Sequence, residues 1–413
     1  MTHRRRRHSR EVIASSQNVV TARKIADDVR NLAPIDDGDG ATVHAHKVEH
    51  AWPRSRQYLH AHNPFQHTNH STTVLPQQNT LLYLVRLSQD TPYASSNSQV
   101  PKPSFPSAFE SNTMASESKN DFTVLVVGAT GNIGKQVVTA LSSKYPGATI
   151  KAGTRNPDSD KALALGGIDG VTVVKAHDSA TIAEEAKGAE FLVIVPPGSE
   201  DRAAQGVAAA KAATAAGVTK IISYSVPGVA DVLFARQFRE LERGIRAVSA
   251  NTIFLRLPFF TDNNWGHAAT IKGMGKIFAP VPVGVNYAQV TVADAGEAGA
   301  AALAQFDRFA GQAFTLVSNH ASQAEIAAAF SKAVGKEVTA VQVPPAAAKE
   351  ALLGAGFPEW QVDGILELWA ALSSDDVARH AAVNVVSRDL EVLLARKGTS
   401  IEQWVEAVKG AFA

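Results

Sequence analysis

The stretch VLVVGATGNIGKQVV, residues 124–138, constrains the fold of this chain more than any other. Apolar, β-branched residues typical of a buried strand run directly into three glycines, and a helical pattern follows them. Such a turn aims backbone N–H groups and the positive end of the helix dipole at an anion, usually a dinucleotide pyrophosphate. In this interpretation Gly128 permits the turn, Gly131 admits the pyrophosphate and Gly134 lets the helix lie close to the strand. A tight strand-to-helix turn without a ligand is the alternative.

Strand-like runs alternate with helical runs through the middle of the chain. The strand-like runs are FTVLVVG, TIKAGTR, VTVVKA, EFLVIVPP, KIISYS and NTIFLRL. This alternation implies right-handed crossovers and a doubly wound parallel sheet of the α/β class, the Rossmann arrangement. The order is more mixed later, where SQAEIAAAFSKAVGK opens with a helix capping box. We therefore predict a dinucleotide-binding core over residues 114–258. Residues 259–413 are predicted to form a small C-terminal substrate domain that contributes late strands to the sheet.

Residues 1–113 differ in composition from the rest, because they are rich in His, Ser, Asn, Gln and Pro and lack sustained periodicity. Such a segment buries too little apolar surface to order itself, so we predict a disordered, basic, His-rich extension. Its start, MTHRRRRHSR, is interpreted as a solvated tail, with a nucleic-acid patch or a nuclear or organellar address as alternatives. Met114, just before the first strand, would also suit a natural protein start. Without Cys or a rigid frame we predict no metal site at the clustered histidines, which are His44, His46, His60, His62, His67 and His70.

Composition limits the class of protein further. Of the 413 residues 45% are hydrophobic, which is enough for a sizeable core, and none is cysteine. The lack of Cys excludes disulfides, thiolate metal ligands and a catalytic cysteine, and it fits a reducing, cytoplasmic setting. No run reaches the roughly 18 apolar residues that a membrane-spanning helix requires. We therefore expect no membrane partner and, although the start of the chain is basic, no nucleic-acid partner.

The end of the second predicted strand bears on which dinucleotide is bound. NAD enzymes usually place Asp or Glu there for the ribose 2′-hydroxyl, whereas this chain reads KAGTRNP, with Arg155 and no acid before Asp158. A guanidinium can pair bidentately with a 2′-phosphate, which favours NADP(H) over NAD(H); a solvated loop cation is the alternative. Asp178, after the third strand, is placed either to meet the adenine side of the site or to cap the next helix, and both interpretations stay open.

Several motifs follow one another in an order typical of a known family. They are VVGATGNIGKQVV, TRNP, RLPFFTDNNW, VTVADAGEA, FTLVSNHASQAEIAAAFSKAVGKEVTAVQVPP and GFPEWQVDGILELWA. Together, over about residues 122–411, they resemble the NmrA-like family of atypical short-chain dehydrogenases. The resemblance implies an NADP(H)-binding Rossmann domain, a small C-terminal substrate domain, and activities that range from NAD(P)H-dependent reductases to redox-sensing binding proteins without catalysis. It also implies cofactor contacts at Gly128, Thr130, Gly131, Asn132, Ile133 and Arg155, with Val195, Pro196 and Pro197 beside the nicotinamide.

The candidates for proton transfer are few. Ordinary short-chain dehydrogenases need a Tyr four residues before a Lys, because the ammonium lowers the pKa of the phenol. None of the six tyrosines has a Lys at that spacing, so the standard dyad is absent. Tyr224, at the end of the predicted fifth strand, is the best available donor, with core packing and a backbone-bonded hydroxyl as the alternative. Reductases resembling isoflavone reductase would show a catalytic Lys in FARQFRELERG, where this chain has Arg236 and Arg239, which stay charged.

The stretch LPFFTDNNWG supplies a candidate substrate pocket. Phe259, Phe260 and Trp265 would form aromatic walls and Asn263 a polar contact, which suits a flat aromatic or quinoid ligand; plain core packing is the alternative. Hydride transfer itself requires only that an acceptor be held against the nicotinamide. We predict an NADPH-dependent oxidoreductase acting on a small conjugated or quinone-like acceptor. The alternative is a non-enzymatic NADP(H)-sensing regulator that binds a protein partner.

Overall fold

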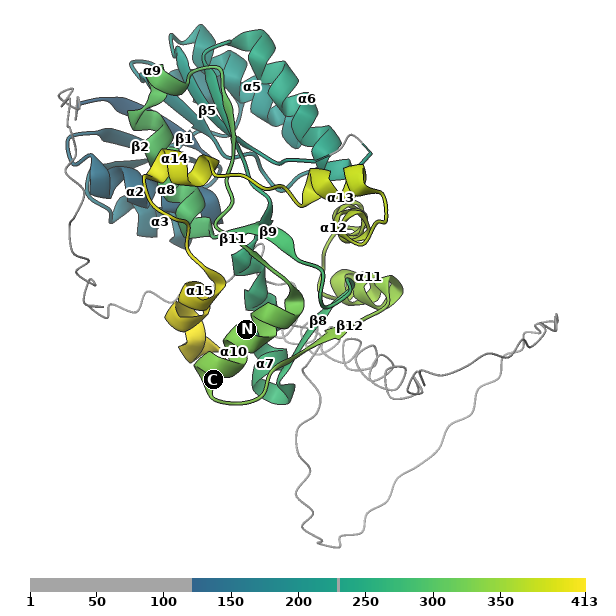
Figure 1. Cartoon of the computed structure of the whole chain (residues 1–413). Coiled ribbons are helices and arrows are strands. Elements are labelled where there is room, and N and C mark those ends of the chain that lie inside the picture. Colours follow the sequence, from purple (N-terminus) through teal and green to yellow (C-terminus); the bar gives the residue numbers. More distant parts are fainter. Residues whose placement is uncertain (1–120, 229–230) are drawn as a thin grey trace, which may run out of the picture. The chain divides into compact units, whose positions relative to one another are not determined.

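The computed structural model describes residues 121–228 and 231–413, and its centre is a seven-stranded sheet (Figure 1). The strands lie in the order β10-β6-β5-β4-β1-β2-β3, and every neighbouring pair is parallel. Their bounds are β1 (Thr123–Val127), β2 (Thr149–Thr154), β3 (Val171–Lys175), β4 (Phe191–Ile194), β5 (Lys220–Ser225), β6 (Thr252–Arg256) and β10 (Ala313–Thr315). The predicted doubly wound parallel sheet is therefore confirmed.

Helices cover both faces of the large sheet. Successive strand residues point to opposite faces, so each strand contributes apolar side chains to two cores. Val124 and Val126 of β1 belong to the core packed against α2 and α8, whereas Leu125 belongs to the core packed against α4, α5 and α6. The helices around the sheet are α2 (Asn132–Lys144), α3 (Asp160–Gly166), α4 (Ser179–Glu185), α5 (Arg202–Ala215), α6 (Leu233–Val248), α8 (Val292–Ala304), α9 (Phe306–Phe309) and α14 (Asp389–Leu394).

The winding of the chain reverses beside β1. Strands β2 and β3 follow on one side of β1, and β4, β5 and β6 follow on the other. The amide of Val195 donates to the carbonyl oxygen of Val127 at 3.0 Å, which holds the carboxyl ends of β4 and β1 together. In open α/β sheets ligands bind in the crevice at this kind of switch point, so the carboxyl ends of β1 and β4 are where a ligand is expected.

Residues after β6, together with Val232 and Ala235 at the start of α6, build a third apolar core around two small sheets. The first sheet has the strand order β11-β9-β7 and the second pairs β12 with β8. Their strands are β7 (Phe259–Phe260), β8 (Lys276–Ala279), β9 (Tyr287–Val290), β11 (Asn319–Ala321) and β12 (Thr339–Gln342). The helices are η2 (Thr261–His267), α7 (Ala268–Met274), α10 (Gln323–Val334), α11 (Pro345–Gly354), α12 (Glu359–Leu372), α13 (Val377–Val383), α15 (Ile401–Val408) and η3 (Lys409–Ala411). The same region also returns to the large sheet, where Phe314 of β10 is in register with Leu255 of β6.

Several predictions concern residues that the structure does not describe. The N-terminal extension, residues 1–113, lies outside the described residues, and so do its six clustered histidines. Among residues 121–228 and 231–413, no helix is long and apolar enough to cross a membrane. Within the same two ranges, no group of three or more His, Asp or Glu side chains is arranged to hold a metal ion.

Candidate cofactor and substrate site

The turn between β1 and α2 has a backbone that fits only glycine at two positions. Gly128 has a φ of +83°, in the left-handed region, and a Cβ there would clash with the carbonyl oxygen of Val195. A Cβ on Gly134 would lie 2.7 Å from the Cα of Ala129. Helix α2 can therefore approach β1 this closely only because Gly134 has no side chain. This geometry agrees with the roles predicted for both glycines.

The first turn of α2 is open to a ligand. Gly131 and Asn132 are exposed, and no described side chain caps the helix, since the N-cap residue is Gly131 itself. The first turn also carries no acidic residue. The positive end of a 13-residue helix therefore lies at the switch point with no side-chain cap among the described residues, an arrangement suited to a phosphate group.

Two contacts fix this turn against β2. The amide of Ala129 donates to the carbonyl oxygen of Gly153 at 3.1 Å, and the hydroxyl oxygens of Thr130 and Thr154 lie 3.5 Å apart. The turn is thus held between the ends of β2 and β4, on both sides of β1. The predicted cofactor residues that gather here, besides Gly128 and Gly134, are Thr130, Gly131, Asn132, Ile133, Val195 and Pro196. Their contacts with a cofactor stay a prediction.

Arg155 lies immediately after β2 and is exposed. None of the ion pairs among the described residues involves its guanidinium. Its neighbour Thr154 is in register with Lys175, the last residue of β3, so two cationic residues lie at the same carboxyl edge. The position leaves Arg155 accessible to a phosphate on a ligand bound over β2, and the binding of such a phosphate stays a prediction.

Asp178 caps α4. Its Oδ1 accepts hydrogen bonds from the amide of Thr181 at 2.9 Å and from the hydroxyl of Thr181 at 2.8 Å. These bonds hold the pKa of Asp178 below its ordinary value. Of the two interpretations left open by the sequence, the structure shows the helix cap. A contact of Asp178 with adenine stays untested.

Tyr224 lies in the interior and not at the surface of the site. Its side chain is 1% exposed, and its hydroxyl donates to the carbonyl oxygen of Ala295 at 2.8 Å. Burial raises the pKa of Tyr224 above its ordinary value, and a Cβ on Gly299 of α8 would clash with the hydroxyl. The structure shows the core-packing alternative, which corrects the expectation of a proton donor, because a substrate has no access to this hydroxyl.

The rings of β7 do not form one pocket wall. Phe259 and Phe260 are consecutive strand residues, so they point to opposite faces. Phe260 packs against the core of the large sheet, whereas the ring centre of Phe259 lies 5.1 Å from that of Tyr287 and 5.0 Å from that of Trp369. The alternative of core packing applies to both rings, and the prediction that they line one pocket is wrong.

Trp265 also packs in the core of the C-terminal region. Its ring centre lies 5.1 Å from that of Phe412 and 5.8 Å from that of Trp404. Asn263, by contrast, is exposed. The four predicted pocket residues thus separate into three environments, because alternate faces of β7 and the short helix η2 carry them apart.

A buried carboxylate at the carboxyl edge was not predicted from the sequence. Glu242 of α6 accepts hydrogen bonds from the hydroxyl of Ser225 at 2.7 Å and from Nε of Arg256 at 2.8 Å. Burial disfavours its ionised form, but the bonds from Arg256 and Ser225 outweigh this effect and hold the pKa of Glu242 below its ordinary value. Since Ser225 and Arg256 end β5 and β6, this cluster ties α6 to the edge of the sheet. The available signal was a charged residue, Arg256, at the end of the otherwise uncharged strand TIFLR.

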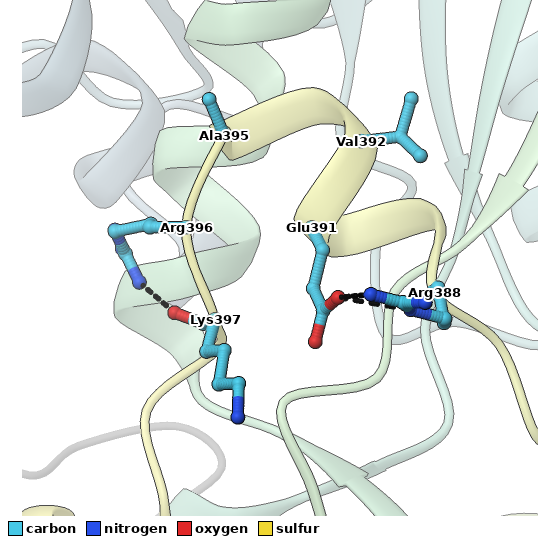
Figure 2. Close-up of a pocket in the computed structure, with 6 residues that line it drawn as sticks. All are labelled: Arg388, Glu391, Val392, Ala395, Arg396 and Lys397. Carbon is cyan, nitrogen blue, oxygen red and sulfur yellow. Dashed lines mark hydrogen bonds and ion pairs between the residues drawn. The ribbon is translucent and has the colours of Figure 1, made fainter. Parts of the chain in front are cut away.

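An open hollow lies elsewhere, around α14 (Figure 2). It has a volume of about 520 Å³. Its lining residues are Arg388, Glu391, Val392, Ala395, Arg396 and Lys397. Both arginines have partners within the protein, since Arg388 pairs with Glu391 at 2.8 Å and Arg396 pairs with Asp294 of α8 at 2.9 Å. Helix α14 packs against β10 at the edge of the sheet, so the hollow is separate from the switch point between β1 and β4.

The parallel sheet, its switch point and the open glycine turn define a protein of the Rossmann class with a nucleotide-binding type of strand–turn–helix unit. More narrowly, the chain belongs to the NmrA-like family, whose family model matches residues 120–393. The resemblance carried by the sequence motifs is thereby confirmed.

Two relatives and one solved structure are similar over most of this chain. An NAD(P)H azoreductase from Xenophilus azovorans is 29% identical over 62% of this chain and 89% of its own length. Quinone oxidoreductase 2 from Escherichia coli is 28% identical over 68% of this chain and 97% of its own length. The crystal structure of an NADPH-dependent quinone oxidoreductase from Escherichia coli in complex with NADPH has a TM-score of 0.59 and 27% identity, and the match covers 69% of this chain and 99% of that one.

Proposed function

We propose that this protein is an NADPH-dependent oxidoreductase that reduces a small conjugated or quinone-like acceptor. The observation that carries the proposal is the open glycine turn at the switch point, with the exposed Arg155 at the end of the neighbouring strand. Relatives named as an azoreductase and a quinone oxidoreductase support this class of chemistry. Both names refer to conjugated acceptors, which can take up a hydride without an acid held beside them.

The residues present fit NADPH along the carboxyl edge of the sheet. The first turn of α2 would hold the pyrophosphate, because Gly131 lets a ligand approach the N–H groups closely. Arg155 would pair with the 2′-phosphate at the end of β2. The segment that begins at Val195, after β4, would then lie beside the nicotinamide, since β4 is on the opposite side of β1 from β2.

The protein itself has to bind NADPH, orient the acceptor and shield the reacting atoms. A bound NADPH supplies the hydride, and the protein holds an acceptor against the nicotinamide face. Because Tyr224 is closed off and already donates to Ala295, we infer that the proton reaches the reduced acceptor from water. Quinones and azo compounds suit this arrangement better than simple ketones, whose reduction requires a positioned acid.

The direct test is steady-state kinetics with the full chain. NADPH oxidation at 340 nm would be followed with a neutral naphthoquinone, an azo dye and a simple ketone. We expect the quinone and the azo dye to accelerate NADPH oxidation and the ketone to have no effect. Tight NADPH binding with no acceleration by any acceptor would contradict the proposed oxidoreductase.

A second candidate is a non-enzymatic NADP(H)-sensing protein that binds a protein partner. The enclosed Tyr224 and the lack of a Tyr/Lys dyad favour it, because the described site offers no proton donor of the usual kind. A sensor would distinguish NADPH from NADP⁺ in its affinity for a partner and would not turn over. Titration with both cofactors, combined with the kinetic test, separates the two candidates.

A further inference from the structure

An arginine without a counter-ion lies near the proposed nicotinamide side of the site. Arg202 is the first residue of α5, seven positions after Val195, and its side chain is only 8% exposed. Its guanidinium carbon lies 5.2 Å from the ring centres of Phe234 and Phe238 and 5.3 Å from that of Trp360. The four residues come from α5, α6 and α12, three helices that meet beside the carboxyl edge of the sheet.

The charge of Arg202 is not neutralised by the protein. Nε donates to the carbonyl oxygen of Ser199 at 3.0 Å, and no carboxylate in the described part of the chain forms an ion pair with the guanidinium. Burial lowers the pKa of Arg202 to about 10, so the group is still charged at neutral pH. The three rings stabilise the buried cation in part by cation–π attraction, but they carry no negative charge, so an anion bound beside the guanidinium would add a charge-assisted hydrogen bond.

The acidic residues that precede Arg202 do not form an ion pair with its guanidinium. Glu200 and Asp201 are both exposed, and both carboxylate oxygens of Asp201 accept from the amide of Gln205 at 2.8 Å. Gln237 of α6 adds a second unpartnered group, because its Nε2 donates to the carbonyl oxygen of Glu200 at 3.0 Å while its Oε1 is buried without a partner among the described residues. Arg202 and Gln237 thus both donate to carbonyl oxygens of the same loop, Ser199 and Glu200.

The rings around Arg202 leave part of their surface open. Phe234 and Trp360 are half-buried, with their ring centres 6.2 Å apart in an edge-to-face arrangement. Helix α12 lies beside the start of α6 in Figure 1, and the amide of Leu233 donates to the carboxylate of Glu367 at 2.6 Å. An aromatic surface next to a guanidinium that has no carboxylate partner is complementary to a flat ring that carries an acidic group.

We propose that Arg202 anchors an acidic substituent, a carboxylate or a sulfonate, of the aromatic acceptor, and that Phe234 and Trp360 contact its ring. This inference rests on the proposed oxidoreductase function and narrows its substrate class to acidic aromatic acceptors. Arg202 is then a binding residue that determines specificity and takes no part in hydride transfer.

The test compares an acidic and a neutral acceptor in the full chain. Wild type and Arg202→Gln would be assayed with NADPH and either 1,4-naphthoquinone-2-sulfonate or 2-methyl-1,4-naphthoquinone. Losing a charge-assisted bond should raise KM for the sulfonate by roughly tenfold or more and leave KM for the neutral quinone nearly unchanged. Arg236→Gln is the matched control, because it removes the same charge from an exposed site on α6 and should leave both KM values unchanged. Equal changes for both quinones in Arg202→Gln would overturn the inference.

A binding measurement makes the test independent of turnover and of the folding of the variant. Calorimetric titration of the wild-type chain with naphthalene-2-sulfonate and with the uncharged naphthalene-2-sulfonamide should show roughly tenfold tighter binding of the sulfonate. Equal affinities would overturn the anchor. If neither quinone is reduced but the sulfonate binds more tightly than the sulfonamide, the proposed oxidoreductase function is wrong and the anion-binding role of Arg202 is supported.

Discussion

The hydroxyl of Tyr224 donates a hydrogen bond of 2.8 Å to the carbonyl oxygen of Ala295, which ties the end of β5 to the first turns of α8 through the interior. This bond and the burial of the ring assign Tyr224 to packing, although its place near the end of the fifth strand resembles that of a catalytic residue. Any reduction at this site therefore takes its proton from another source.

Replacing Tyr224 by Phe should change stability and leave catalysis intact. The variant loses one buried hydrogen bond, so the free energy of unfolding should fall by about 1 kcal/mol. The value of kcat for quinone reduction should stay within about twofold of wild type, because the hydroxyl does not reach the acceptor. Urea denaturation and steady-state kinetics measure the two effects. A hundredfold loss of kcat in a variant of unchanged stability would restore a catalytic role.

Replacing Arg155 by Ala should weaken NADPH binding selectively. The lost charge-assisted hydrogen bonds contribute about 1.5 to 3 kcal/mol, so the affinity for NADPH should fall by roughly tenfold to a hundredfold. Binding of NADH, which has no 2′-phosphate, should barely change. Calorimetric titration with each cofactor measures both affinities.

Two further variants sharpen the test of Arg155. Arg155→Asp should repel the phosphate and offer an acceptor to a ribose hydroxyl, which shifts the preference toward NADH. Arg243→Ala, a charge removal at an exposed position of α6, should leave both affinities as in wild type. Equal losses for NADPH and NADH in Arg155→Ala would show that the residue only supports the loop.

Adding a single methyl group at Gly134 should disrupt the turn. In Gly134→Ala the new Cβ would lie 2.7 Å from the Cα of Ala129, and the backbone there has no room to shift. The clash should cost roughly 3 kcal/mol and outweigh the ~1 kcal/mol that Ala contributes to helix propensity. Gly284→Ala, where no atom lies within 4 Å of the added Cβ, should change stability by less than about 0.5 kcal/mol. Comparable thermal stability of the two variants would contradict the close packing of α2 on β1.

His267 should make stability depend on pH. It is buried at the end of η2, its Nδ1 has no hydrogen-bond partner among the described residues, and burial lowers its pKa from 6.5 to about 4. Below pH 6.5 the unfolded chain takes up a proton that the folded chain does not, so stability is lost as the pH falls from 6.5 toward 4. For this one group the loss between pH 7.5 and pH 5 is roughly 2 kcal/mol.

The contribution of His267 is isolated by a variant. His267→Gln does not titrate, so its free energy of unfolding should fall by roughly 2 kcal/mol less than that of wild type between pH 7.5 and pH 5. Urea denaturation at the two pH values gives the difference, and the other titrating groups cancel in the comparison. Parallel pH profiles for the two proteins would mean that His267 is protonated in the folded state.

The parts of the candidate site that the sequence predicted best are those with a local cause. A left-handed φ at Gly128 and the close approach at Gly134 are conditions of one strand–turn–helix unit, and 15 consecutive residues specify it. The position of Arg155 is equally local, because it follows directly from the end of β2. The capping role of Asp178 was one of two stated alternatives, since its partner Thr181 is only three residues away.

The sequence by itself determined the order of strands and helices, the glycine turn and the family, since strand and helix periodicity and backbone sterics act over short distances. Only the tertiary structure decided which side chains face a ligand. Tyr224 is closed off by Ala295, 71 residues later in the chain, and the neighbours Phe259 and Phe260 enter different cores. Arg202 meets Phe234 and Trp360 only because α5, α6 and α12 converge. Burial and the supply of partners are properties of packing between distant segments, and no local pattern specifies them.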